Sequence, residues 1–304
     1  MKWVFLCGYT ALVAGAVGLG FMRHFRLAAG PPRVSWSGLL FGHRGCRKVR
    51  GIPENTLRAF QYAFDNGCKG VECDVRLTKD DEVVVFHDNN IDGQLDCPQG
   101  RKRIDELTLK ELKSYRYLED PTGKIRVPTL EETVLLCRKS RTKILIEVKD
   151  LRNIRRCVDK ILTLYQRYPE YMYEQTTIIS FNPIVLYYIR QLDAKVATGS
   201  IYEREFIRYC INSKVDEIPR ILHIWPAFFD CVLLHFQEWV ASWFLGCSLM
   251  CPDYRLYSEA KHRRWQSQGI TLYFWGFEDN TVCTPEFKQP GIFIAADDKY
   301  EGFK

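Results

Sequence analysis

Three acidic residues lie inside apolar stretches of the sequence, where a carboxylate costs free energy unless its charge is compensated. Glu72 and Asp74 are two residues apart in "GVECDV", so both point to the same side of an extended strand. Glu147 lies in "KILIEVK", two residues before Lys149. A metal ion is the simplest compensation, and hard oxygen ligands suit Mg²⁺, or alternatively Ca²⁺, rather than zinc. The sequence therefore predicts a divalent metal site at Glu72, Asp74 and Glu147.

Two histidines and an arginine occupy similar places at the ends of apolar stretches. His43 and Arg44 follow "GLLFG", and His87 closes "EVVVFH". A single histidine at a strand end is usually an ordinary loop residue, but several ionisable residues in one arrangement indicate a site. Imidazole has an unperturbed pKa of about 6.5, so one ring can remove a proton while the other protonates a leaving oxygen. With Arg44 and Lys149 to hold phosphoryl oxygens, this set of residues favours cleavage of a phosphate ester.

Strand-like stretches alternate with helical patterns along most of the chain, which is typical of a parallel sheet. About eight strands in this length favour an α/β fold of the (β/α)₈ TIM barrel type, with a doubly wound sheet as the alternative. In a barrel, the carboxyl ends of the strands meet on one face, which would gather the residues described above. The expected strands are 38–43, 70–75, 82–87, 143–149, 176–181, 195–200, 270–275 and 291–295, and the clearest helical patterns are 54–67, 129–140 and 153–168.

Composition agrees with a folded domain of this size. The chain has 304 residues, 46% of them hydrophobic, and a net charge of +6 from 43 basic and 37 acidic residues. Because the charges are interspersed, nothing favours a nucleic-acid partner. The 12 cysteines show no regular spacing, and we expect unpaired thiols, with disulfides as the alternative.

The N-terminus carries an uncharged run of twenty residues, 3–22, which is long enough to cross a bilayer. We expect residues 1–26 to form an uncleaved membrane anchor and residues 27–37 a linker, with a cleaved signal peptide as the alternative. Residues 38–304 would form the barrel. This predicts a single-pass membrane protein. More basic residues follow the run than precede it, which favours a cytoplasmic barrel.

Two segments interrupt the alternation of strands and helices. Residues 88–127 are polar and rich in turns, and we expect them to form an insertion after an early strand. Residues 225–252 are aromatic, and Asp230, Gln237 and Ser248 would share one face of a helix there. The apolar opposite face predicts a helix lying in a membrane interface, with a buried core helix as the alternative.

Several motifs resemble one enzyme family. "GHRG", "PENTL.AF", "GVECDV.LTKD" and "VVVFHD" are similar to the opening signature of the glycerophosphodiester phosphodiesterases, and "LIEVK" resembles their third metal-binding strand. The resemblance is strong over 40–150 and weaker to about residue 298. The N-terminal run resembles the membrane-bound glycerophosphoinositol-type branch, which places the barrel in the lumen or outside the cell, against the charge count.

The resemblance implies a TIM barrel that hydrolyses glycerophosphodiesters to glycerol 3-phosphate and an alcohol with a divalent metal. In the family scheme the substrate's own 2-hydroxyl attacks phosphorus, and water opens the resulting cyclic phosphate. Matching positions imply metal ligands, an acid/base pair and residues that bind the substrate or organise the metal shell. The ligands are Glu72, Asp74 and Glu147, the pair is His43 and His87, and the remaining residues are Arg44, Glu54, Lys149 and Trp275.

Three departures from the family pattern leave the alcohol group of the substrate open. Cys46 replaces a glycine in an unusually basic loop, "FWGFEDN" keeps only Trp275 of its motif, and "GIFIAADD" replaces a glycine- and threonine-rich ending. Glycerophosphoinositol, lysophospholipids and N-acyl glycerophosphoethanolamines are all compatible substrates. One alternative is a lysophospholipase D or a related phospholipase. Another is a non-catalytic barrel that binds signalling partners at a membrane.

Overall fold

The computed structural model describes most of the chain outside its ends and three internal gaps of more than one residue. The described residues are 18, 20, 22–27, 32–98, 100–150, 152–204, 224–277 and 284–298. All statements about the fold and the site refer to these residues.

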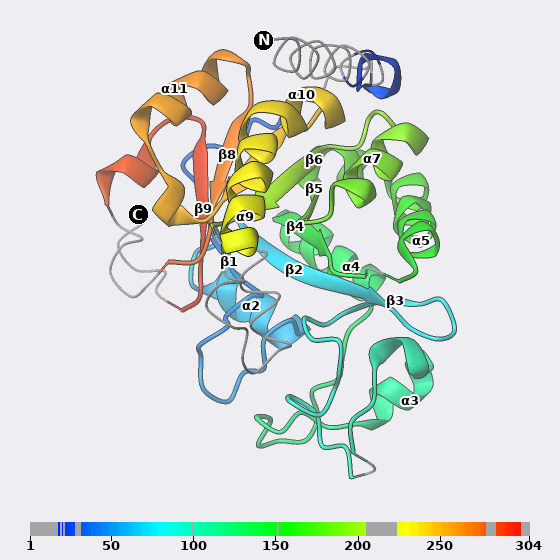
Figure 1. The fold of residues 1–304 in the computed structure, drawn as a ribbon. Coiled ribbons are helices and arrows are strands. Elements are labelled where there is room, and N and C mark those ends of the chain that lie inside the picture. Colours follow the sequence, from blue (N-terminus) through cyan, green and yellow to red (C-terminus); the bar gives the residue numbers. More distant parts are fainter. Residues whose placement is uncertain are drawn as a thin grey trace, which may run out of the picture.

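A closed parallel barrel forms the centre of the molecule (Figure 1). Parallel strands follow one another in chain order around it, and β1 pairs with both β9 and β2, which closes the ring. The closure confirms the predicted TIM-type barrel and excludes the open doubly wound sheet. The barrel strands are β1 (Leu40–Gly42), β2 (Gly70–Leu77), β4 (Lys143–Val148), β5 (Thr176–Ser180), β6 (Thr198–Tyr202), β7 (Leu249–Pro252), β8 (Thr271–Phe274) and β9 (Ile292–Ala296).

Helices surround the barrel (Figure 1). Capping residues in the sequence explain where several of these helices begin. Thr129 caps α4 by accepting from the amide of Glu132, while the Glu132 carboxylate bonds back to the amide of Thr129. Thr56 caps α2 through a single bond, which its side chain accepts from the amide of Ala59. The α-helices are α2 (Leu57–Asp65), α3 (Leu109–Ser114), α4 (Leu130–Ser140), α5 (Ile154–Arg167), α6 (Pro169–Gln175), α7 (Pro183–Leu192), α9 (Ile224–Phe236), α10 (Ser242–Leu245) and α11 (Glu259–Ser267).

Alternation along β2 shows how the sequence sorts side chains between the lumen and the helices. Val71, Cys73 and Val75 are buried in the core between the barrel and its helices. The intervening Glu72 and Asp74 therefore face the lumen. Gly70 also faces the lumen, and a β-carbon there would lie 2.3 Å from the ring of Phe41, so the bulky neighbour requires a glycine.

The lower lumen is a packed apolar core. The ring of Phe293 packs against those of Phe41 and Tyr273, with centroid distances of 5.0 and 5.1 Å. Trp36 packs against Phe41 and Phe293 and is only 4% exposed. The segment expected to be a linker thus contributes a side chain that fills the amino-terminal end of the barrel.

One expected strand lies outside the barrel, and one barrel strand was missed. The run 82–87 forms β3 (Val83–Val85), which pairs antiparallel with β2 at the edge of the sheet. Its place in the ring is taken by β7, which occupies the end of the aromatic segment 225–252. An apolar run shows that a strand is buried but carries no information about its partner.

The turn-rich residues 88–127 form a small subdomain beside the barrel, with its own apolar cluster (Figure 1). Phe86, Ile91, Leu95, Leu112 and Tyr117 are among its buried residues. The only helices described in this segment are α3 and the short 3₁₀ turn η1 (Ile104–Glu106).

In the segment 225–252 the polar side chains of Asp230 and Gln237 face inward. Helix α9 continues through a π-helical turn, η3 (Gln237–Ala241), into α10. Asp230 and Gln237 are buried, whereas Trp239 is 64% exposed. Ser248 does not share their face, because the helix ends at Gly246 in a left-handed conformation and Ser248 directly precedes β7.

The predicted single-pass membrane location is contradicted: no helix among the described residues is both long and apolar enough to cross a bilayer. The predicted anchor, 1–26, lies mostly outside the described residues; residues 22–25 are helical, and the amide of Leu27 bonds to the carbonyl of Phe244. None of the described cysteines forms a disulfide, and most are buried.

Candidate active site

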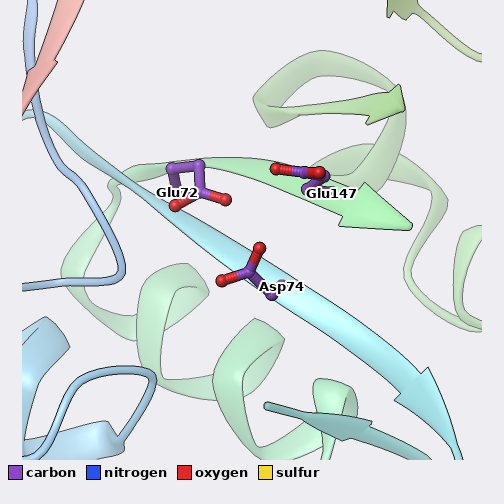
Figure 2. A group of neighbouring side chains, drawn as sticks. All are labelled: Glu72, Asp74 and Glu147. Atoms are coloured by element: carbon purple, nitrogen blue, oxygen red, sulfur yellow. The ribbon is translucent and has the colours of Figure 1, made fainter. Parts of the chain in front are cut away.

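Three carboxylates converge in the upper lumen (Figure 2). Asp74 of β2 lies directly opposite Glu147 of β4 in the parallel register, and Glu72 is one pleat below. One oxygen from each of the three lies within 4.8 Å of the others. A cation with metal–oxygen bonds of about 2.0–2.6 Å could contact all three, since such bonds separate two ligand atoms by at most about 5 Å.

The surroundings of Glu72 suit a bound cation. Glu72 is 2% exposed, and its Oε1 has no hydrogen-bond partner. Burial, followed by the nearby carboxylates of Asp74 and Glu147, raises the pKa of Glu72 well above its usual range. A buried oxygen without a partner beside two other carboxylates is the donor set that a hard divalent cation would satisfy.

Two cations partly balance the acidic triad. Lys149 Nζ lies 2.6 Å from Glu147 Oε1 and 3.4 Å from Asp74 Oδ1, and Arg44 Nε lies 3.4 Å from Asp74 Oδ2. Burial opposes the ionisation of Asp74, but Lys149 and Arg44 outweigh it and hold the pKa of Asp74 well below its usual range. Burial also opposes the charge on Lys149, but Glu147 and Asp74 raise its pKa. Asp74 and Lys149 therefore both stay charged.

The loop after β1 reaches the triad through two residues in left-handed backbone conformations. Arg44 has φ 51° and Asn55 has φ 57°, which are uncommon for residues other than glycine. The amide of Arg44 donates to Glu72 Oε2 at 3.0 Å, and the amide of Asn55 donates to the carbonyl of Arg44 at 2.9 Å. The Asn55 side chain donates to Asp74 Oδ2 at 2.8 Å and accepts from the amide of Asp74 at 3.2 Å. The loop thus fixes the orientation of two of the three acids.

Glu54 holds Arg44 rather than facing the triad. Its Oε1 accepts from Arg44 Nη1 at 2.8 Å and from Gln94 Nε2 at 3.4 Å, and Arg47 Nε lies 3.8 Å from its Oε2. Since a carboxylate repels a phosphate, this geometry is that of a residue that positions the Arg44 guanidinium.

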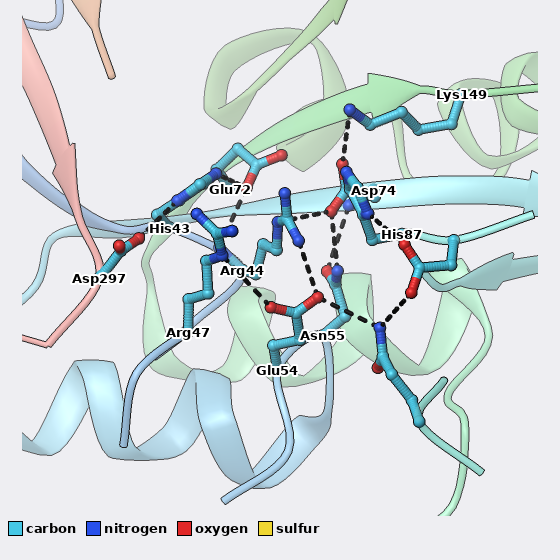
Figure 3. A network of polar contacts seen from close by, with 12 residues as sticks. His43, Arg44, Arg47, Glu54, Asn55, Glu72, Asp74, His87, Lys149 and Asp297 are labelled. Atoms are coloured by element: carbon cyan, nitrogen blue, oxygen red, sulfur yellow. Dashed lines mark hydrogen bonds and ion pairs between the residues drawn. The ribbon is translucent and has the colours of Figure 1, made fainter. Parts of the chain in front are cut away.

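His43 lies beside Glu72 and His87 lies beside Asp74 (Figure 3), and each histidine has a carboxylate at its Nδ1. His43 Nδ1 lies 2.7 Å from Asp297 Oδ1, and its Nε2 lies 3.8 Å from Glu72 Oε2. His87 Nδ1 lies 2.8 Å from Asp88 Oδ1, and the charge of His87 acts on Asp74. Both rings can therefore present Nε2 to a substrate held between them.

Arg76 joins the loop that carries His87 to the loop that carries Lys149. Its Nε and Nη2 donate to the carbonyl of His87 at 2.9 and 2.6 Å, and its Nη1 donates to the carbonyl of Lys149 at 3.3 Å. Gln94 of the inserted subdomain adds a bond to Asp88 Oδ2 at 3.1 Å. Arg76 and Gln94 carry no signal in the sequence, because their partners are backbone carbonyls and residues of other segments.

Trp275 stands apart from the triad. It follows β8, and its indole Nε1 donates to the carbonyl of Cys251 at 3.0 Å, so this donor is not directed at a phosphate. Its ring meets Phe181 edge to face, and Lys149 Nζ lies 5.6 Å from the centre of the Phe181 ring. Trp275 is thus part of an aromatic wall beside the lysine.

Sequence reasoning missed Asp297 as a site residue. The signal was present, because Asp297 directly follows the last barrel strand, as His43 follows the first. The rule that strand ends converge applies to β9 as well as to the early strands.

A closed parallel barrel with a buried acidic triad, two imidazoles and paired cations at the carboxyl ends of its strands defines a barrel enzyme that hydrolyses phosphodiesters. The model of the glycerophosphoryl diester phosphodiesterase family matches residues 43–300. The chain belongs to this family.

Individual relatives agree with the family assignment. The chain is 29% identical over 244 residues to human "Glycerophosphodiester phosphodiesterase 1", a match that covers 77% of this chain and 70% of that protein. An Oleispira antarctica phosphodiesterase, solved in complex with the product sn-glycerol-3-phosphate, has the same fold with a TM-score of 0.65 and 18% identity, covering 90% of this chain and 95% of that one. The Agrobacterium tumefaciens glycerophosphodiester phosphodiesterase also has a TM-score of 0.65, at 16% identity, covering 87% and 98%.

Proposed function

We propose that this enzyme hydrolyses glycerophosphodiesters to glycerol 3-phosphate and an alcohol, using a divalent metal held by Glu72, Asp74 and Glu147. The family assignment supplies the reaction class, and the observation that carries the rest is the convergence of the three carboxylates within 4.8 Å. The hardness of the oxygen donors favours Mg²⁺, with Ca²⁺ as the alternative. When bound, the metal would polarise a phosphoryl oxygen and stabilise the charge that develops on it.

The remaining roles follow from the charges around the triad. Arg44 and Lys149 lie on either side of Asp74 and would hold the phosphoryl oxygens that face away from the metal. Glu54 keeps the Arg44 guanidinium in place. Trp275 and Phe181 offer an aromatic wall to the less polar part of the substrate.

His43 and His87 would move the protons. In the proposed scheme, one imidazole takes the proton of the substrate's 2-hydroxyl as its oxygen attacks phosphorus, and the other gives a proton to the departing alcohol oxygen. The histidines then exchange roles while water opens the cyclic phosphate. Each ring has a carboxylate at Nδ1, which leaves Nε2 for both tasks.

The test is turnover by the purified full chain with and without EDTA. Glycerophosphoinositol, glycerophosphoethanolamine and a lysophospholipid serve as substrates, and ³¹P NMR identifies the products. We expect glycerol 3-phosphate from at least one water-soluble diester and no turnover in EDTA. Release of only a lysophosphatidic acid would instead support the lysophospholipase D reaction.

Single variants test the assigned residues. His43→Ala and Glu72→Ala should abolish turnover while circular dichroism shows an intact fold. His235→Ala, at an exposed position on α9, is the matched control and should behave like the wild type. Turnover at the wild-type rate by either site variant would contradict the proposed site.

A further inference from the structure

The first and last strands of the barrel bring a histidine and an aspartate together across the seam where the barrel closes. Gly42 of β1 pairs with Ala296 of β9, so the next residues, His43 and Asp297, stand side by side. The amide of His43 donates to the carbonyl of Ala296 at 2.8 Å. The side chains meet as well, with 2.7 Å between His43 Nδ1 and Asp297 Oδ1.

This contact determines which ring nitrogen carries the proton. A carboxylate can only accept, so a neutral His43 bonded to Asp297 must carry its hydrogen on Nδ1. Its Nε2 is then a bare acceptor, and Nε2 is the atom that points toward Glu72, at 3.8 Å from Oε2. Without Asp297, the ring could bind its proton on Nε2 and face the triad with the wrong atom.

Asp297 is itself held from its other side. Lys48 Nζ lies 3.1 Å from Asp297 Oδ2, while Oδ1 contacts the histidine. The side chains of His43 and Asp297 are 14% and 11% exposed, so solvent competes little with their bond. Burial opposes the ionisation of Asp297, but the bond and charge of His43, with smaller contributions from Lys48 and Arg47, together outweigh it, and the pKa of Asp297 lies below its usual range.

The other histidine–aspartate pair, His87 and Asp88, is more exposed and is local in the sequence. Asp88, the partner of His87, is 45% exposed and adjacent in the chain. Asp297 instead comes from 254 residues away and depends on closure of the barrel. The contacts among Lys48, Asp297 and His43 therefore form only when β1 and β9 pair. Lys48 belongs to the basic loop that departs from the family pattern.

We propose that Asp297 is a positioning residue for His43, which fixes the Nδ1–H tautomer and the ring orientation, and that Lys48 holds Asp297 in place. The proposal rests on the proposed function, in which His43 transfers a proton through Nε2. Asp297 would act through His43 and not on the substrate directly.

The first test is kinetic. In Asp297→Asn, whose amide can also donate, we expect kcat to fall about 10²- to 10⁴-fold, as when an orienting carboxylate is lost from a catalytic histidine. KM and the affinity for Mg²⁺, measured by calorimetry, should change less than about threefold. Asp298→Asn, one residue further along the same strand end, is the matched control and should leave kcat unchanged. Lys48→Gln should give a smaller loss than Asp297→Asn.

The second test reads the tautomer directly and does not depend on activity. Long-range ¹⁵N–¹H correlation spectra at about pH 8, above the ordinary pKa of histidine, distinguish the two neutral forms of His43. We expect Nδ1–H in the wild type and a shift toward Nε2–H in Asp297→Asn. His43→Ala serves to assign the signals.

The outcomes separate this proposal from the proposed function. An unchanged tautomer, or a kcat within about threefold of the wild type in Asp297→Asn, would overturn the positioning role even if His43→Ala abolishes turnover. A wild-type chain that releases no glycerol 3-phosphate would instead overturn the proposed function.

Discussion

Replacing Glu72 with glutamine should stabilise the metal-free protein while it abolishes turnover. Glu72 is buried against Asp74 and Glu147, with the ligand oxygens no more than 4.8 Å apart. At an effective dielectric constant of about 20, two unit charges at that separation repel by about 3.5 kcal/mol. Glutamine removes the charge and keeps an oxygen that can accept from the amide of Arg44, the existing partner of Glu72.

The net gain is smaller than the bare repulsion, for two reasons. Arg44 and Lys149 offset part of the negative charge. Glu72 can also take up a proton, which limits the cost to about 1.4 kcal/mol for each pH unit above its unperturbed pKa, or about 3.4 kcal/mol at pH 7. We therefore expect Glu72→Gln to raise the free energy of unfolding in EDTA by about 1–3 kcal/mol, or Tm by roughly 2–5 °C.

The pH dependence provides a second signature with a definite sign. Because the folded pKa of Glu72 is raised, the folded state binds more protons than the unfolded state between the usual value of 4.5 and the raised value. The contribution of Glu72 to stability is therefore present at low pH and is lost as the pH rises through this window. The wild type in EDTA should lose stability across it, and Glu72→Gln should lose less.

Thermal and urea unfolding in EDTA and in Mg²⁺ measure these effects, with the exposed Glu119→Gln as the control. Mg²⁺ should stabilise the wild type and Glu119→Gln more than Glu72→Gln. The reasoning is refuted if Glu72→Gln is less stable than the wild type in EDTA at pH 7, or if Mg²⁺ stabilises it as much as the wild type.

Three further predictions follow from the contacts around the triad. Asn55→Ala removes both bonds to Asp74 and places alanine, which disfavours the left-handed region, at φ 57°. The free energy of unfolding measured in urea should fall by about 2–3 kcal/mol, and Mg²⁺ affinity measured by calorimetry should fall about 10- to 100-fold. Asn55→Gly should recover part of the stability but not the affinity. Arg76→Gln should lower kcat about tenfold with little change in KM, because the carbonyl of His87 loses two donors, and an unchanged kcat would show that the loop holds its position without the arginine. Chelation of divalent metal should abolish turnover, and titration with Mg²⁺ or Ca²⁺ should restore it with a stoichiometry near one; activity that survives exhaustive chelation would exclude a metal role for the triad.

The site residues on the early strands were predictable because two rules of strand geometry act together there. Glu72 and Asp74 share a face through the two-residue repeat of a strand, and parallel strand ends converge, which brings Glu147 beside Asp74. No property of the local sequence distinguishes a barrel strand from an edge strand, so β3 was placed in the ring. The four residues of β7 were missed because they directly follow an aromatic helix and were included in the same apolar segment.

The aromatic segment shows a second limit of sequence patterns. The pattern correctly placed Asp230 and Gln237 on one face but did not show that this face is buried, with Gln237 Nε2 3.4 Å from the carbonyl of Ile201. Periodicity reports that two faces differ, and only the neighbours decide which face meets solvent. Arg76 was missed for a related reason, since most of its hydrogen bonds go to backbone carbonyls, which any residue carries.

The pairing of β1 with β9 has a consequence for how the protein matures. His43 is among the first residues of the barrel to be synthesised, and Asp297 is among the last. A growing polypeptide that has not yet added β9 can have every other site residue in place and still lack the partner of this histidine. Hydrolytic competence should therefore appear only when translation has passed the final strand and the ends of the sheet have joined, a late and long-range event for a chain of this topology.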